Sequence, residues 1–321
     1  MRNIFQPKRY KSKIEENIKA QILQNKDKQI QFYNFWEQSY ETMFWYRFLQ
    51  ARPHLLNNKL RYGFYSVFGD RSIIHKTTTD INIFYSAENV KNRFNYADHF
   101  LTENQIHLAM GFEYFEHERY IRFPNWMDVF FLKNEDIMTI CNQLRFPNIE
   151  NKQKFASCIC SHDNIKGADG LRTSIIDALS EIDVVSCPGK FRHNDDSLVN
   201  AFNDNKLEYL KQFQFNICPE NSNAMGYVTE KIFHAISAGC IPIYWGSYNR
   251  PELDVLNQDA IIFWNKDGDN TNAIKLIKEL VTYPKLMNSF LEQPRLLPDA
   301  GEYIANRFEK VEKLFNDLVS L

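Results

Sequence analysis

The sequence predicts an α/β protein with two halves of similar size, each built around a parallel sheet. The chain has 321 residues, which is long for a single core and suits two units of about 150 residues each. Short stretches of strand character alternate with helical stretches along most of the chain, as in parallel βαβ units. A polar stretch containing a proline, residues 145–153, interrupts this cycle. We therefore expect one domain over residues 1–150 and a second over residues 151–321.

The first half begins and ends with helical patterns and holds several short strands. Residues 9–27 and 40–51 have helical patterns, and residues 126–145 carry mostly helical signals. Pro124 ends the last strand before that third stretch. Aromatic residues make up 15% of the chain, and most of their rings are expected to fill the core. The expected strands are 30–36, 62–69, 81–86, 105–112 and 119–123.

The second half repeats the alternation. The last helix, from Glu302 to Leu321, places four apolar residues on one face and carries charges of both signs. We expect it to pack back on the protein rather than bind a membrane. The expected strands are 154–161, 214–218, 240–246 and 260–264, and the other expected helices are 171–182, 207–213, 228–239 and 272–280. The residues of that apolar face are Ile304, Phe308, Val311 and Phe315.

Composition excludes several classes of function. The net charge of −2 gives no basic surplus for nucleic-acid binding. No apolar run is long enough for a transmembrane helix, and the amino terminus has no apolar h-region, so no secretory signal is expected. The six cysteines lack zinc-site spacing, and the acidic pairs at 195–196 and 267–269 lie in turn-like contexts, so no metal site is expected. A cytoplasmic protein is expected, with a peripheral position at the inner membrane face as the alternative.

The segment 215–247 is expected to run from a strand through a polar loop into a helix and a second strand. Lys231 stands in the first turn of that helix, where a cation opposes the helix dipole. A phosphate would explain this position, because free N–H groups, the dipole and the ammonium would converge on it. Taken alone, a lysine whose ammonium reaches into water is the more common case.

Three neighbours of Lys231 also have two interpretations each. The Glu230 carboxylate could accept hydrogen bonds from two vicinal ribose hydroxyls, or it could simply be an acid favoured by the helix dipole. Tyr227 could pack on a nucleotide or cap the helix. Asn221 could bind oxygens of a ligand or close a local turn, which is the commoner role in a loop.

The run ENS…GYVTEKIFHAISAGCIPIYWGS, residues 220–247, resembles the signature of the family-ten α-1,3-fucosyltransferases. Other stretches match in the same order, so the resemblance covers roughly residues 30–265. They are FYSAENV at 84–90, ERYIRFPNW at 118–126, and KFASCICSHDN at 154–164, followed by Leu171 and Arg172. The departures are Ala87 for the usual glycine, Pro219 for the usual aromatic residue, and SHDN for a shorter Ser-Asn.

This resemblance implies a GT-B fold, in which the parallel sheets of two Rossmann-like domains face a central cleft. The amino-terminal domain would bind the acceptor and the carboxy-terminal domain the donor. The implied reaction is inverting transfer of L-fucose from GDP-β-L-fucose to a hydroxyl of GlcNAc or Glc, as in N-acetyllactosamine of a surface glycan. The partners would be GDP-fucose and an oligosaccharide or glycolipid acceptor. No metal cofactor would be required, because cationic side chains replace it.

The resemblance also assigns roles to individual residues. Glu88, just past the expected strand 81–86, is the candidate base for the acceptor hydroxyl. Without the resemblance it would be an ordinary loop acid, and Arg172 would be a member of a surface ion pair. Arg172 and Lys231 would neutralise the departing diphosphate. The other implied donor-binding residues are Asn221, Tyr227 and Glu230.

Two other functions remain open at this point. The chain could transfer another GDP-linked sugar with the same site, or it could be a catalytically silent module that binds a nucleotide sugar. A silent relative would be expected to lose at least one of four residues, and all four are present. They are Glu88, Arg172, Glu230 and Lys231.

Overall fold

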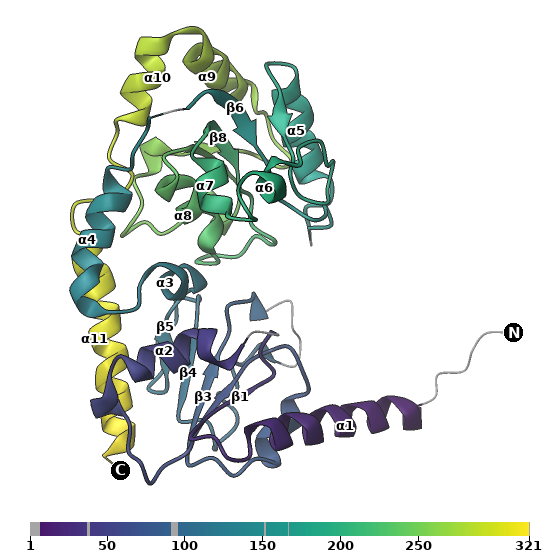
Figure 1. Ribbon diagram of the computed structural model, residues 1–321, viewed down its shortest axis with the longest axis vertical. Helices are drawn as coiled ribbons and strands as arrows, with labels where there is room; N and C mark the ends of the chain where they lie inside the picture. The colour runs from purple at the N-terminus through teal and green to yellow at the C-terminus, as the bar shows by residue number, and fades with distance from the viewer. Residues whose placement is uncertain (1–6, 37–38, 91–95, 151, 166, 321) are drawn as a thin grey trace, which may run out of the picture. The chain divides into compact units, whose positions relative to one another are not determined.

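The computed structural model describes residues 7–36, 39–90, 96–150, 152–165 and 167–320. These residues form two compact units (Figure 1). The first unit comprises the chain up to Phe123 together with Arg307–Leu321, and the second comprises Pro124–Asn306. The second unit thus begins before the expected linker.

The early start of the second unit has a packing reason. Helices α3 (Asn125–Phe130) and α4 (Asn134–Arg145) pack against α8 (Glu230–Ser237) of the same unit. The ring of Trp126 in α3 stacks on that of Phe233 in α8 at a centroid distance of 4.3 Å. Residues 124–145 therefore share the core of the second unit rather than that of the first.

The first unit holds a five-stranded parallel sheet in which the strands follow one another in chain order. Phe32 lies opposite Phe64, and Phe64 lies opposite Ile83, which sets the register of the first three strands. The strand residues are buried, as expected for a parallel sheet covered on both faces. The strands are β1 (Ile30–Tyr33), β2 (Tyr62–Tyr65), β3 (Ile81–Tyr85), β4 (Leu108–Gly111) and β5 (Tyr120–Arg122).

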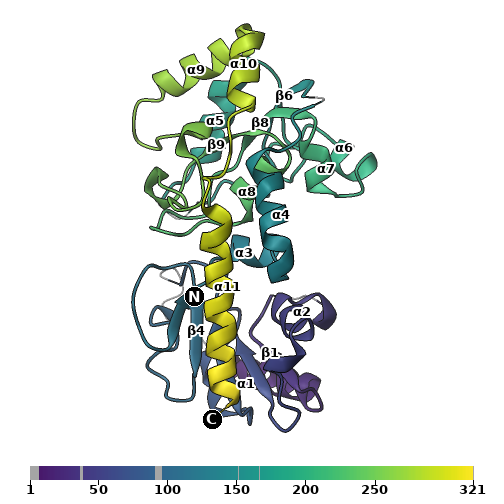
Figure 2. The ribbon, with the colours of Figure 1, turned by 90° about the vertical axis from the view of Figure 1, so that its left-hand side faces the viewer.

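Successive residues of β2 cover opposite faces of this sheet. The Phe64 ring lies 5.9 Å from that of Trp45 in α2 (Phe44–Gln50) and 6.3 Å from that of Phe315 in α11 (Ala300–Val319). Tyr65 joins the apolar cluster on the other face, which Ile18 of α1 (Pro7–Asn25) completes. Figure 2 shows α11 crossing in front of β4. The unit also contains the 3₁₀ turns η1 (Tyr40–Thr42), η2 (Pro53–Leu55) and η3 (Arg71–His75).

The last helix packs back on the protein, as its pattern predicts. All four residues of the predicted apolar face, Ile304, Phe308, Val311 and Phe315, are fully buried. Ile304 belongs to the second unit, whereas the other three belong to the first. The same helix therefore contributes to both cores.

The second unit holds a second five-stranded parallel sheet, in which the order is β10-β9-β8-β6-β7. The chain leaves β6 to form β7 on one side and then returns to form β8 on the other, so the order reverses between β6 and β8. Ligands of such sheets bind beyond the carboxyl ends of the strands at this reversal. The strands are β6 (Lys154–Ser157), β7 (Val185–Ser186), β8 (Phe213–Ile217), β9 (Ile241–Tyr244) and β10 (Ile262–Phe263).

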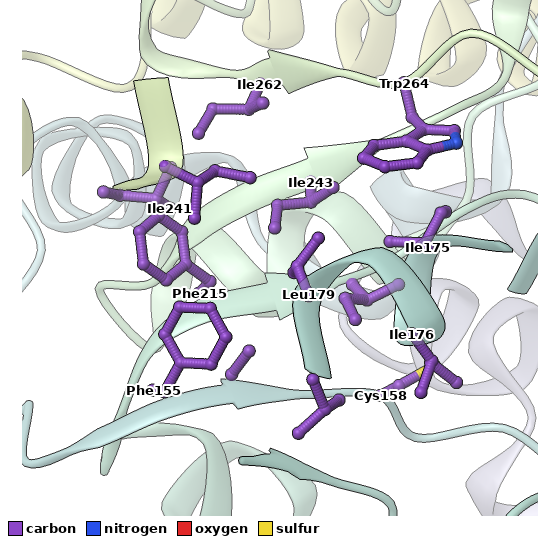
Figure 3. Close-up of a cluster of buried hydrophobic side chains, with 14 of the residues drawn as sticks. Phe155, Cys158, Ile175, Ile176, Leu179, Phe215, Ile241, Ile243, Ile262 and Trp264 are labelled. Atoms are coloured by element: carbon purple, nitrogen blue, oxygen red, sulfur yellow. The ribbon is translucent and has the colours of Figure 1, made fainter. Parts of the chain in front are cut away.

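One face of the second sheet is covered by α5 (Leu171–Ser180), whose Ile175, Ile176 and Leu179 point toward the strands (Figure 3). They meet Phe215 of β8 and Ile243 of β9 in one buried cluster. The remaining elements are α6 (Ser197–Asn200), α7 (Lys206–Leu210), η6 (Ser247–Asn249), η7 (Gln258–Ala260), α9 (Thr271–Thr282) and α10 (Pro284–Leu291).

The predicted α/β class with two parallel sheets is confirmed, and so is the helix stop at Gly239, which has a φ of +74°. The sequence patterns did not predict β7, which has only two residues, or α10, which begins at Pro284. Among the described residues, no helix combines the length and the apolar character that crossing a bilayer requires.

Replacing Phe315 by alanine should destabilise the first unit, because it opens a cavity among the rings of Trp45, Phe48 and Phe64. We expect a loss of about 3–5 kcal/mol in the free energy of unfolding, measured by urea denaturation. Lys313→Ala, on the exposed side of the same helix, is the control and should change it by less than about 0.5 kcal/mol. Equal losses in the two variants would contradict the packing described for α11.

Candidate active site

A cavity of about 130 Å³ opens at the reversal point of the second sheet. Its walls come from the residues that follow β6 and β8 and from side chains of α5, α7 and α8. Three basic side chains line it, those of Arg172, Lys206 and Lys231, against one carboxylate, that of Glu230. The sequence predicted three of these four residues for the donor site, and the structure brings those three together.

The cations in this cavity repel one another. The charge of Arg172 disfavours the Lys231 ammonium and acts to lower its pKa, although burial and the carboxylates of Glu220 and Glu230 act on it more strongly. An anion in the cavity would remove this cost, because a charge-assisted hydrogen bond to it replaces the repulsion. The cavity is therefore suited to phosphate groups.

Beneath the cavity, the fully buried carboxylate of Glu220 connects the polar loop to the start of α8. It accepts hydrogen bonds of 2.7 Å from the Thr229 backbone N–H and of 2.7 Å from the Thr229 hydroxyl. The Lys231 Nζ lies 3.3 Å from the same carboxylate. Glu220 thus satisfies the backbone N–H of Thr229, the N-cap residue of α8, whose own side chain makes no capping hydrogen bond.

Burial and mutual attraction both shift the pKa values of Glu220 and Lys231. Burial raises the pKa of Glu220 above its ordinary value, although Lys231 and Thr229 act in the opposite direction. Burial also opposes the charge of Lys231, but the carboxylates of Glu220 and Glu230 outweigh it and raise the pKa of the lysine. The ammonium is therefore retained at neutral pH, and its side chain keeps 26% exposure toward the cavity.

Gly246 makes room for the buried carboxylate. Its φ of +147° is a conformation that residues with a Cβ rarely adopt. A Cβ at this position would lie 2.7 Å from the Cγ of Glu220 and 2.9 Å from the Tyr244 hydroxyl. The glycine of the IPIYWGS run is thus explained by the close approach of Glu220.

Arg172 is held in place by two loops. One Nη donates to the carbonyl of His162 and the other donates to Asn221 Oδ1 at 2.9 Å. Asn221 therefore binds the guanidinium rather than closing a local turn through that oxygen. Arg172 is 4% exposed, and these two hydrogen bonds fix the direction of its guanidinium before any ligand arrives.

The start of α5 is capped by a side chain of the protein itself. The carboxylate of Asp163 accepts hydrogen bonds from the backbone N–H groups of Arg172, at 2.8 Å, and Thr173, at 2.9 Å. Asp163 thus supplies the negative charge at the start of this helix. Arg172 can contribute to ligand binding through its guanidinium, and the helix terminus is already capped.

The other two predicted site residues lie elsewhere. Tyr227 is 2% exposed and is not part of the cavity wall described above. Glu88 belongs to the first unit and follows β3, the central strand of its sheet. Its backbone N–H is bound by the Ser86 hydroxyl at 3.1 Å, which fixes the turn, and its side chain is half-buried.

Sequence reasoning missed three polar groups of this site. The sequence patterns placed Glu220 in the polar loop without a role, and they assigned no role to Lys206 or Asn216. Asn216 lies on β8, is 5% exposed and lines the cavity, and its Oδ1 has no hydrogen-bond partner among the described residues. Buried polar atoms are almost always paired, so an unpaired amide oxygen beside the cavity marks Asn216 as an unusual residue of its wall. A polar residue on a buried strand that leads into a polar loop is the sequence signal that could have identified Asn216 as a site residue.

No cluster of three or more metal-ligating side chains occurs in the parts of the chain that the structure describes. In each of the two acidic pairs noted in the sequence, at 195–196 and 267–269, one carboxylate accepts hydrogen bonds from neighbouring residues. Asp195 accepts from the Ser197 N–H and the Tyr209 hydroxyl, and Asp269 accepts from Thr271.

Two family models match the chain. Residues 30–129 match the α-(1,3)-fucosyltransferase FucT N-terminal domain, and residues 149–293 match the carboxy-terminal domain of glycosyltransferase family 10 (fucosyltransferase). The chain belongs to glycosyltransferase family 10. Together the matched ranges cover most of both units, and the second contains the whole cationic cavity.

Relatives of this family include curated fucosyltransferases. An α-(1,3)-fucosyltransferase FucT of Helicobacter pylori is 31% identical over 236 residues, which are 64% of this chain and 44% of that protein. An α-(1,3)-fucosyltransferase B of Drosophila melanogaster is 32% identical over 96 residues, 30% of this chain and 21% of that protein. The chain thus spans less than half of the length of these relatives.

Solved structures show that the fold is of the GT-B type. A crystal structure of an α1,3-fucosyltransferase superposes with a TM-score of 0.60 at 22% identity, over 89% of this chain and 91% of that one. A crystal structure of an α1,3-fucosyltransferase with GDP-fucose superposes with a TM-score of 0.57 at 23% identity, over 88% and 90% of the two chains.

The coupling between Glu220 and Lys231 can be measured by a double-mutant cycle. Glu220→Gln should lower the free energy of unfolding by about 2 kcal/mol, because the ammonium loses its buried partner. Adding Lys231→Met should recover about 1 kcal/mol of that loss, since no unpaired charge remains. Urea denaturation of the four proteins gives the coupling.

The exposed pair Glu208 and Lys211 provides the matched control, with about half of each side chain exposed. Its cycle should show a coupling below about 1 kcal/mol. If the effects of Glu220→Gln and Lys231→Met simply add, the two groups do not stabilise each other as described.

Proposed function

We propose that this protein transfers L-fucose from GDP-β-L-fucose to a hydroxyl of a glycan, with inversion at the sugar carbon. The observation that carries the proposal is the cavity at the reversal point, where three cations meet in a chain of this family. Two relatives are named α-(1,3)-fucosyltransferases, which supports an α-1,3 linkage, and a structural neighbour was crystallised with GDP-fucose. A glycan containing GlcNAc or Glc, such as N-acetyllactosamine, is the proposed acceptor.

The cations of the cavity would act on the leaving group. When the bond between the sugar carbon and the diphosphate breaks, negative charge gathers on the departing GDP. Arg172 and Lys231 are positioned by protein contacts before the reaction, so they stabilise this charge without reorganisation. This supports a transfer that requires no metal ion. Glu230 would hold the ribose hydroxyls, because its carboxylate lines the same cavity.

Glu88 is the proposed base. The acceptor oxygen forms its bond to the sugar carbon as the bond to the diphosphate breaks, and the acceptor proton passes to the Glu88 carboxylate. The supporting observation is its place after the central strand of the first sheet, where the turn is fixed by Ser86 and the side chain keeps partial exposure. A carboxylate that is not fully desolvated can accept a proton late in such a displacement.

Features of the chain also favour an acceptor and a location. The exposed rings of Tyr114 and Phe115 line a hollow of the first unit, together with Arg122, and offer surfaces on which sugars stack.

All six cysteines are unpaired, which supports a reducing cytosol as the place of the reaction, with a peripheral position at the membrane as the alternative. Another GDP-linked sugar on the same site is the second candidate for the donor.

Calorimetric titration with GDP, GDP-fucose, UDP and ADP, without metal, tests the donor class. GDP and GDP-fucose should bind in preference to UDP and ADP. Lys231→Met should weaken GDP binding about tenfold or more, because a charge-assisted hydrogen bond to phosphate is lost, and should leave guanosine binding unchanged. Lys211→Ala, an exposed lysine of the same unit, is the control. Preference for UDP or ADP would contradict the proposed donor.

Glu88→Gln should lower turnover by about a hundredfold or more while GDP affinity stays the same, since the amide cannot accept the acceptor proton. Rates are measured with GDP-fucose and N-acetyllactosamine at saturating donor concentration. Glu41→Gln, at an exposed acid of the first unit, serves as the control and should keep full turnover. Full turnover in the Glu88 variant would remove this residue from the mechanism.

A further inference from the structure

Two thiols lie side by side in the wall of the cationic cavity. Cys158 and Cys160 directly follow β6, and because they are two residues apart in an extended stretch, their side chains point the same way. The two Sγ atoms are 3.6 Å apart, which is a hydrogen-bond distance for sulfur. Arg172 lines the same cavity, so a cation, two sulfurs and an open space occur together.

The two thiols differ in access. Cys158 is 1% exposed, whereas Cys160 is only partly buried. The hydrogen bond with Cys160, together with burial, raises the pKa of Cys158 well above its ordinary value. The same hydrogen bond lowers the pKa of Cys160, against the effect of burial and with the support of Arg172. Cys160 is thus both the more accessible sulfur and the one whose pKa is lowered, which favours its thiolate, the nucleophilic form.

The other four cysteines differ from Cys160 in both accessibility and pKa. All four are buried, and burial raises the pKa of Cys141 to about 12 and that of Cys187 and Cys240 to about 11. The pKa of Cys218 is likewise raised well above its ordinary value by burial. Reaction with a soft electrophile should therefore select one thiol of the six.

We propose that Cys160 is a covalent modification site, at which small disulfides form an adduct that obstructs the nucleotide cavity. The Cys160 thiolate attacks one sulfur of the disulfide R–S–S–R, the S–S bond of the reagent breaks, and R–S⁻ leaves and takes up a proton. The product is the mixed disulfide Cys160–S–S–R, so the number of disulfide bonds is unchanged. The exchange follows from the thiol pair alone, whereas the obstruction of GDP rests on the proposed function.

The geometry explains why one adduct is enough. The cavity measures about 130 Å³, and Cys160 shares its wall with both proposed phosphate-binding cations. A group added to this sulfur occupies space that a diphosphate would need. The thiolate itself would be stabilised by Arg172, the same group that would otherwise hold the phosphate, so bound GDP and the reactive thiolate compete for one cation.

The test uses 2-hydroxyethyl disulfide as the probe on the whole, folded protein. Intact mass and peptide mapping should show a single hydroxyethylthio adduct on Cys160. The adduct should abolish GDP binding in calorimetry, and dithiothreitol should restore it. Saturating GDP should slow the exchange about tenfold or more, because the open cavity is needed for attack.

Variants separate the roles of the two sulfurs. Cys160→Ser should take up no adduct, and Cys158→Ala should react about fivefold more slowly, as expected for the loss of one hydrogen bond. Cys141→Ala, at a buried cysteine remote in sequence, should react as the parent protein does. Peptide mapping of the adduct on the parent protein identifies the modified cysteine even if a variant folds poorly.

An adduct on a different cysteine, or none on the native protein, would overturn the modification site. An adduct on Cys160 that leaves GDP binding intact would overturn the obstruction, while the calorimetry would still support the nucleotide site. If neither the parent protein nor its adduct binds GDP, the proposed function fails and the thiol chemistry stands.

Discussion

The donor-binding half is organised around one fully buried carboxylate. Glu220 accepts the Thr229 N–H at the start of α8 and pairs with the Lys231 ammonium, so it fixes both the helix and the cation that faces the cavity. Removing one partner of a buried pair costs far more than a surface pair is worth, because a charge remains in a medium of low dielectric constant. The requirement reaches β9 as well, since only glycine fits at position 246 beside this carboxylate. The positions of β9, of the polar loop, of α8 and of Gly246 thus all depend on the Glu220 carboxylate.

The two sheets contribute unequally to ligand binding because their strand orders differ. In the second sheet the order reverses between β6 and β8, and this leaves a hollow beyond the strand ends that loops alone do not fill. The cations and the two adjacent thiols all lie there. In the first sheet the strands follow chain order, so no such reversal occurs among its five described strands. Its proposed contribution, Glu88, depends on a single turn after the central strand.

The sequence predicted the larger elements and the positions of the charged side chains, and it failed where a role depends on distant packing. Periodicity located α11 and its buried face, whereas the two-residue β7 is too short to leave a pattern. Arg172 lines the cavity as predicted, but no local pattern indicated that Asp163 caps the start of its helix. Glu220 was overlooked because a loop glutamate is normally solvated, and only its burial under Lys231 makes it structural. Local patterns carry no information about such long-range pairing.

The division of α11 between the two units has a consequence for biosynthesis. The aromatic face formed by Trp45 and Phe64 leaves the ribosome well before Phe315, which covers it and is made only after residues 124–306. At about 5–20 residues per second, that face stays uncovered for on the order of ten seconds or more. During this interval the nascent chain presents a client surface for chaperones. The second unit, although later in the sequence, can bury its own sheet first.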